Sequence, residues 1–163
     1  MNDFTELTKN IATTEDLNLI LADITKAESF SYNSRVKHLS KALKGGVSGV
    51  FEEFLEKLDL DGKVPSSENE KAAYFSSLKS NLGKLPKMEI ELAFSPDKSF
   101  IKKIVDFVRE ATNTEVILDI NVKPNILAGV TIGYKGKFKD YSFSAKLDEV
   151  LKQKYAKRIH ESI

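Results

Sequence analysis

The sequence contains no cysteine and only two histidines, His38 and His160, among its 163 residues. Without cysteine the chain can form neither disulfides nor thiolate metal sites, and it has no thiol nucleophile. Two histidines so far apart in the sequence disfavour a histidine-rich metal site. The lack of cysteine also fits a reducing compartment. We therefore expect neither a metal nor a cofactor in this protein.

The chain also lacks an excess of charge of either sign and any long hydrophobic run. Its 25 Lys and Arg residues are balanced by 24 Asp and Glu residues, so no overall field attracts nucleic acid. The apolar runs fall far short of the ~20 residues that a membrane helix needs, which predicts no direct membrane insertion. The N-terminus MNDFTELTKN lacks the charged start and apolar core of a signal peptide. Together with 41% hydrophobic and 30% charged residues, this is typical of a globular cytoplasmic protein.

The first 86 residues predict a bundle of helices. Two capping boxes mark helix starts, one formed by Thr13 and Asp16 and the other by Ser67 and Glu70. Between them, a helix is expected from about Ser34 to the pair Gly45–Gly46. The most regular helical stripe of apolar residues then follows, made up of Val47, Val50, Phe51, Phe54, Leu55 and Leu58.

After Pro86 the apolar period changes from that of helices to that of strands. Alternating apolar residues predict strands within residues 88–94, 116–122 and 130–134, and a fourth strand is expected at 138–141. The sequence therefore predicts an α+β protein with a helical domain, residues 1–86, and a small C-terminal α/β domain with a mixed sheet, residues 87–163.

Three local signals refine this second domain. Ser95 is the expected N-cap of a helix that begins with Pro96, since serine caps well and proline suits the first helical position. The pair Lys135–Gly136 permits a tight hairpin, because glycine adopts the positive φ that such turns need. A closing helix is predicted from the spacing of Phe143, Leu147, Val150 and Leu151.

Motifs for catalysis or ligand binding are weak throughout. The glycine-rich stretch KGGVSGV, residues 44–50, lacks the spacing of a phosphate loop and is better explained as a break between helices. The DLDGK stretch that starts at Asp59 hints at a calcium loop, but Val64 stands at the position that requires glycine, so the end of a helix is favoured. His38 is interpreted as a surface or boundary residue. We predict no catalytic residue.

The stretch VKPNILAGVTIGYKGKFKDYSFSAKLDEVL, residues 122–151, resembles the signature of the delta subunit of rotary ATP synthases, the oligomycin-sensitivity-conferring protein family. That signature runs V-D-P-x-x-I-G-G, then apolar strand residues, then D-x-S-x-x-x-[RK]-L. The residues that match it in register are Val122, Pro124, Ile126, Leu127, Gly129, Asp140, Ser142, Lys146 and Leu147. The chain departs from the signature at Lys123, Ala128 and Ser144, where the family has aspartate, glycine and a frequent arginine.

The matching residues have structural roles. Pro124 would stiffen a turn, and Gly129 would allow a close backbone approach or an unusual dihedral angle. The side-chain oxygen of Asp140 or Ser142 would cap the following helix. These four residues and Leu147 form the expected structural signature.

By this resemblance, the protein is a non-catalytic stator subunit of an F-type ATP synthase, with a helical bundle about one helix shorter than the family's. The bundle would hold the N-terminal segments of the alpha subunits, and the C-terminal domain would hold the b-type peripheral stalk. The stripe Val47, Val50, Phe51, Phe54 and Leu55 is the predicted partner-binding face. The complex would lie on the cytoplasmic face of the cell membrane. The alternatives are an unrelated α+β interaction module and, less favoured, a small enzyme that uses exposed carboxylates.

Overall fold

A computed structural model describes residues 3–32, 38–124, 128–143 and 146. Contacts divide the chain into two compact units, Met1–Pro86 (unit 1) and Lys87–Ile163 (unit 2). Each unit has its own secondary structure, helical in unit 1 and mixed in unit 2, so the described chain is an α+β protein. Among the described residues, no helix combines the length and the hydrophobicity needed to cross a bilayer.

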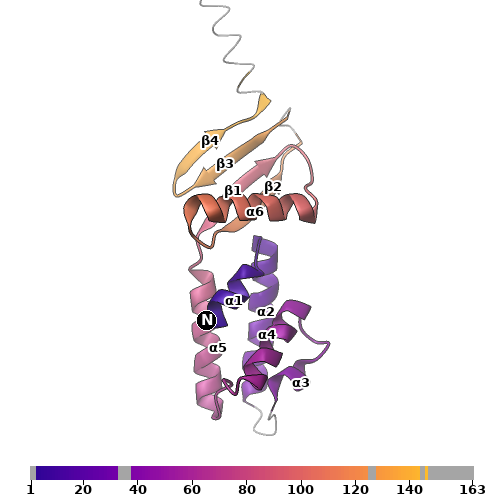
Figure 1. The fold of residues 1–163 in the computed structure, drawn as a ribbon, viewed down its shortest axis with the longest axis vertical. Coiled ribbons are helices and arrows are strands. Elements are labelled where there is room, and N and C mark those ends of the chain that lie inside the picture. The colour runs from indigo at the N-terminus through magenta and orange to yellow at the C-terminus, as the bar shows by residue number, and fades with distance from the viewer. Residues whose placement is uncertain (1–2, 33–37, 125–127, 144–145, 147–163) are drawn as a thin grey trace, which may run out of the picture. The chain divides into compact units, whose positions relative to one another are not determined.

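The described part of unit 1 is built from helices (Figure 1). Two longer helices, α2 (Thr14–Ser31) and α5 (Glu68–Gly83), pack against each other. α4 (Gly49–Leu60) packs against the short α3 (Leu39–Leu43) and against α1 (Asp3–Lys9). Buried apolar side chains from all of these helices, together with Ile11 between α1 and α2, form the interior. Those on the helices are Leu7, Leu17, Ile20, Ile24, Ala27, Leu39, Leu43, Phe51, Phe54, Leu55, Leu58, Phe75, Leu78 and Leu82.

Both predicted capping boxes are confirmed. Thr13 Oγ1 accepts a hydrogen bond from the Asp16 backbone amide at 3.2 Å, and Asp16 Oδ2 accepts one from the Thr13 amide at 2.9 Å. Ser67 and Glu70 form the same reciprocal pair at the start of α5. Each box satisfies backbone donors that have no partner inside the helix.

The other helix boundaries in unit 1 differ from the predicted ones. α1 was not predicted, and α3 begins only at Leu39, while the predicted start at Ser34 lies outside the described residues. α4 begins at Gly49 after its N-cap Ser48, so Val47 precedes the helix instead of forming its first turn.

Unit 2 contains a four-stranded mixed sheet with the strand order β2-β1-β3-β4. Its strands are β1 (Lys87–Leu92), β2 (Ile117–Val122), β3 (Val130–Tyr134) and β4 (Lys137–Asp140). β1 and β2 are parallel and are joined through α6 (Lys98–Thr112), whereas β1–β3 and β3–β4 are antiparallel. A parallel pair needs such a crossover, while the antiparallel β3 and β4 need only a short turn.

The turn between β3 and β4 is the predicted hairpin. Lys135 and Gly136 have φ angles of 49° and 73°, the positive values that such turns require. The predicted start of α6 is wrong by two residues, because Asp97 and not Ser95 is the N-cap, and its carboxylate accepts a hydrogen bond from the Phe100 amide at 2.7 Å. Most of the predicted closing helix, including Leu147, lies outside the described residues.

Candidate functional site

The stripe predicted to bind a partner divides into interior and accessible side chains. Phe51 and Leu55 are fully buried and Phe54 is 5% exposed, and the rings of the two phenylalanines stack with centroids 5.8 Å apart. Val47 is half-buried, whereas Val50 is 37% exposed. Because so small a bundle needs its largest apolar side chains as core, the three buried residues offer no surface to a partner. The partner-binding prediction therefore keeps only Val47 and Val50.

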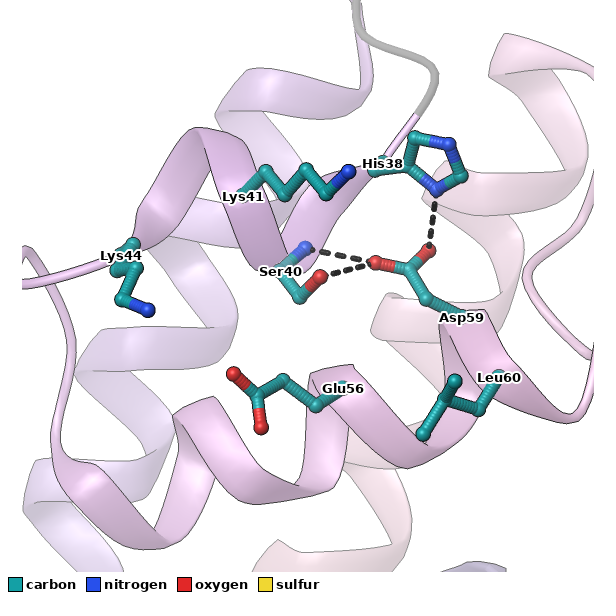
Figure 2. Close-up of a pocket in the computed structure, with 7 residues that line it drawn as sticks. All are labelled: His38, Ser40, Lys41, Lys44, Glu56, Asp59 and Leu60. Atoms are coloured by element: carbon teal, nitrogen blue, oxygen red, sulfur yellow. Dashed lines mark hydrogen bonds and ion pairs between the residues drawn. The ribbon is translucent and has the colours of Figure 1, made fainter.

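A cavity of about 360 Å³ lies between α3 and α4 (Figure 2). Asp59 of α4 lines the cavity and bonds to Ser40 of α3. Oδ2 of Asp59 accepts hydrogen bonds from the Ser40 amide at 3.0 Å and from Ser40 Oγ at 2.5 Å. Its other oxygen, Oδ1, lies 3.9 Å from Nδ1 of His38. The full lining is His38, Ser40, Lys41, Lys44, Glu56, Asp59 and Leu60.

This cluster of serine, histidine and aspartate links two helices. His38 is the N-cap of α3 but makes no side-chain capping bond, and the carboxylate of Asp59 takes over that role from the neighbouring helix. Ser40 Oγ donates to the carboxylate and not to the imidazole, so the hydrogen bond that activates a nucleophilic serine is missing. The cluster is therefore a tertiary helix cap.

The same residue, Asp59, was the first position of the weak calcium-loop motif. In the structure its carboxylate is bonded to Ser40, and Asp61 pairs with Lys63 at 2.9 Å. Within the described part of the chain, no group of three or more His, Cys, Asp or Glu side chains is arranged to hold a metal ion.

Three residues of the structural signature, Gly129, Asp140 and Ser142, lie where β3 begins and β4 ends. Gly129 has a φ angle of 110°, and a Cβ atom added to it would lie 2.5 Å from the carbonyl oxygen of Tyr141 and 2.7 Å from Cα of Ser142. Backbone hydrogen bonds hold the two segments together, from the Tyr141 amide to the Val130 carbonyl at 2.9 Å and from the Phe143 amide to the Ala128 carbonyl at 2.7 Å. Only glycine fits such a crossing.

Asp140 stabilises the chain as it leaves β4. Its Oδ1 accepts a hydrogen bond from the Ser142 amide at 2.7 Å, and hydrogen bonds from the hydroxyl and the amide of Ser142 lower the pKa of the Asp140 carboxyl below its ordinary value of 3.8. Ser142 itself is buried. Pro124 lies in an exposed turn, and Leu147 lies outside the described residues.

Sequence reasoning missed a polar cluster that includes Lys123, one of the residues at which the chain departs from the signature. Lys123 forms an ion pair with Glu91, which also accepts a hydrogen bond from Thr131 Oγ1 at 2.9 Å. Two hydrogen bonds lower the pKa of the Glu91 carboxyl, and the one from Lys123 has a larger effect than the one from Thr131. Glu91 lies on β1, Lys123 directly after β2 and Thr131 on β3. Only the register of the strands could therefore have revealed the cluster.

Comparison with known proteins identifies the family. The family model of the ATP synthase delta (OSCP) subunit matches residues 1–153 and so extends through both units. The chain belongs to this family. The match confirms the resemblance that the stretch 122–151 indicated.

Individual relatives agree at low sequence identity. The delta subunit of ATP synthase from Xanthobacter autotrophicus is 26% identical over 91% of this chain and 72% of its own length. The delta subunit from Methylorubrum populi is 21% identical over 80% of this chain and 69% of its own length. A cryo-EM structure of the Toxoplasma gondii mitochondrial ATP synthase is 12% identical over 85% of this chain and 83% of the matched chain, with a TM-score of 0.38 that is too low to compare folds.

Membership of this family identifies the complex to which the protein belongs. It is a peripheral-stalk subunit of an F-type ATP synthase, and it belongs to the peripheral part of that membrane-bound complex. The alternative of an unrelated interaction module is not favoured.

Proposed function

We propose that this subunit is a static link, in which unit 1 holds N-terminal segments of the alpha subunits and unit 2 holds the b-type stalk. On this proposal the subunit has no catalytic step of its own and acts on the cytoplasmic face of the membrane. The observation that carries the proposal is the match of the family model from residue 1 to residue 153, which includes both units. The residues of the family signature support it, because Gly129 and Asp140 both serve the geometry of the backbone.

A static link needs contacts that persist while the rotor turns. Val50 is the best candidate for such a contact in unit 1, because it belongs to the predicted stripe and is 37% exposed on α4. Leu60 lies at the other end of the same helix and is 85% exposed, which makes it a matched control.

The test uses a tagged chain of residues 1–163 with the alpha and b-type subunits of the same ATP synthase. We expect the unmodified chain to capture both subunits, with mass spectrometry as the readout. Val50→Asp should reduce capture of the alpha subunit and leave capture of the b-type subunit unchanged, since a charge on an apolar contact is costly to desolvate. Leu60→Asp should change neither. Failure of the unmodified chain to capture either subunit would contradict the proposal.

A further inference from the structure

One face of the sheet in unit 2 is apolar. Side chains of residues directly opposite each other in neighbouring strands share a face. The register puts the following residues on this face: Met88, Ile90 and Leu92 of β1, Leu118, Ile120 and Val122 of β2, and Val130, Ile132 and Tyr134 of β3.

This apolar face is covered unevenly. The three side chains from β1 are at most 6% exposed, whereas Val130, Ile132 and Tyr134 are only half-buried. In Figure 1, α6 runs across β1 and β2, whereas β3 and β4 lie beyond the helix. We call Val130, Ile132 and Tyr134 the open strip.

α6 borders the open strip with a second apolar stripe. Val105 and Val108 are its buried residues, but Phe100, Ile104 and Phe107 follow each other at i, i+4 and i+7. Successive helix residues turn by about 100°, so this stripe lies about a quarter turn from the buried one. A right-handed β1–α6–β2 crossover, the usual hand, turns the stripe toward β3.

The stripe on α6 is only partly covered. Phe100 is 37% exposed and Phe107 is 71% exposed. Phe94, which follows β1 and is 49% exposed, extends the stripe, because its ring meets that of Phe100 edge-on with centroids 5.3 Å apart. Apolar side chains that adjoin one another in this way mark an interaction surface more than isolated ones do.

Lysines border the other side of the open strip. Lys137 and Lys139 on β4 lie opposite Tyr134 and Ile132, so they extend from the same face, and both are exposed. Lys135 Nζ lies 5.2 Å from the centroid of the Tyr134 ring. Across the residues that the structure describes, neither Lys137 nor Lys139 forms an ion pair, which leaves both available to acidic groups of a partner.

We propose that the open strip binds an amphipathic helix of a partner protein, with acidic residues along the side of that helix that faces β4. Such a helix would place apolar residues at i, i+3 or i+4, and i+7 between the strip and the α6 stripe. The inference rests on the proposed function, in which unit 2 holds the b-type stalk, and names the surface and the chemistry of that contact.

The charge of the surface favours an acidic partner over the chain's own C-terminal residues. Residues 147–163 contain Lys152, Lys154, Lys157 and Arg158 against Asp148, Glu149 and Glu161. A segment with more cations than anions is a poor complement to Lys135, Lys137 and Lys139. A second copy that bound through the same face would likewise bring lysines toward lysines.

The test measures binding of the chain of residues 1–163 to the purified b-type subunit of the same ATP synthase by isothermal titration calorimetry. We expect Phe107→Glu, and separately the pair Lys137→Glu and Lys139→Glu, to weaken binding about ten-fold or more. Phe138→Glu is the matched control. Phe138 is 65% exposed and lies on β4 between Lys137 and Lys139, but it is opposite Gly133 and so extends from the other face of the sheet. Melting temperatures should stay unchanged, because all four side chains are exposed. Added salt should weaken binding of the unmodified chain more than that of the double lysine variant.

Several outcomes would overturn the proposal. Loss of binding in Phe138→Glu with none in Phe107→Glu would assign the contact to the opposite face of the sheet. Tighter binding after removal of residues 147–163 would show that the chain's own C-terminus occupies the strip. Concentration-dependent dimers that Phe107→Glu abolishes would show that a second copy does. If the unmodified chain binds no b-type subunit at all, the proposed function fails first, which is a distinct result.

Discussion

At the scale of single residues, Gly129 allows the segment that leads into β3 to lie directly against the segment that follows β4. Its positive φ angle of 110° and the approach of Tyr141 and Ser142 act together, since each alone already disfavours any side chain. Sequence reasoning predicted a close approach or an unusual dihedral angle at this residue, and the structure has both.

We predict that Gly129→Ala destabilises the protein by about 2 kcal/mol or more, because the new Cβ adds a clash to the backbone strain. Gly136→Ala is the control: it also has a positive φ, 73°, but nothing lies within 4 Å of its added Cβ. Its loss should be about 1 kcal/mol, from backbone strain alone. Urea denaturation measures both. Equal losses in the two variants would mean that the close approach contributes nothing.

The residues that could be assigned from sequence are those whose partners are local. The capping pair Ser67 and Glu70 is three residues apart, so spacing alone predicted it. Asp59 caps α3 through Ser40, 19 residues away, and Lys123 reaches Glu91 on another strand. No local pattern specifies these contacts, because they exist only once the elements have packed.

At the scale of elements, periodicity predicted the kind of element well and its ends less well. Strands β1 to β3 each follow an apolar alternation, and all four strands are present within or beside the predicted ranges. α1 has only seven residues, too few to show a helical period, and it was missed. The start of α6 was misassigned because Ser95 and Asp97 are both good capping residues, and only the observed hydrogen bond to Phe100 decides between them.

Periodicity also identifies an apolar helix face without saying what covers it. The apolar stripe on α4 predicts a docking face, but its members Phe51, Phe54 and Leu55 are buried in the folded chain. The sequence does not distinguish these cases, because core and interface use the same residue types at the same spacing. Exposure of the folded side chains does distinguish them.

We therefore predict that Phe51→Ala lowers the free energy of unfolding by about 3–5 kcal/mol, the usual cost of removing a buried phenylalanine. Val50→Ala, one residue away and 37% exposed, should change it by less than about 0.5 kcal/mol. Thermal and urea denaturation give both values. A Phe51→Ala variant that melts like the unmodified chain would show that this side chain is not part of the core.

At the scale of the whole molecule, the secondary structure changes from helical to mixed at one point in the chain. Helical periodicity ends before Pro86, strand periodicity begins after Lys87, and the contacts divide the chain between the same two residues. Whether each unit is stable without the other is a separate matter, because small domains bury little surface and are often marginal. Independent folding of residues 1–86 and 87–163 therefore stays a prediction.

We expect limited proteolysis of the intact chain to cut first between Leu82 and Lys87, or in the segment from Asp59 to Ser67. α5 ends at Gly83, and the turns that follow it contain local backbone hydrogen bonds, from the amides of Lys84 and Leu85 to the carbonyls of Asn81 and Leu82. Backbone with few long-range bonds opens locally at low cost, and a protease needs such opening. Mass spectrometry of the first fragments identifies the cleavage sites.

Residues 1–86 and 87–163 can also be produced separately. We expect circular dichroism to show a cooperative thermal melt for each of the two fragments. First cuts inside β1 or β2, or a fragment that does not melt cooperatively, would show that the two units depend on each other for folding.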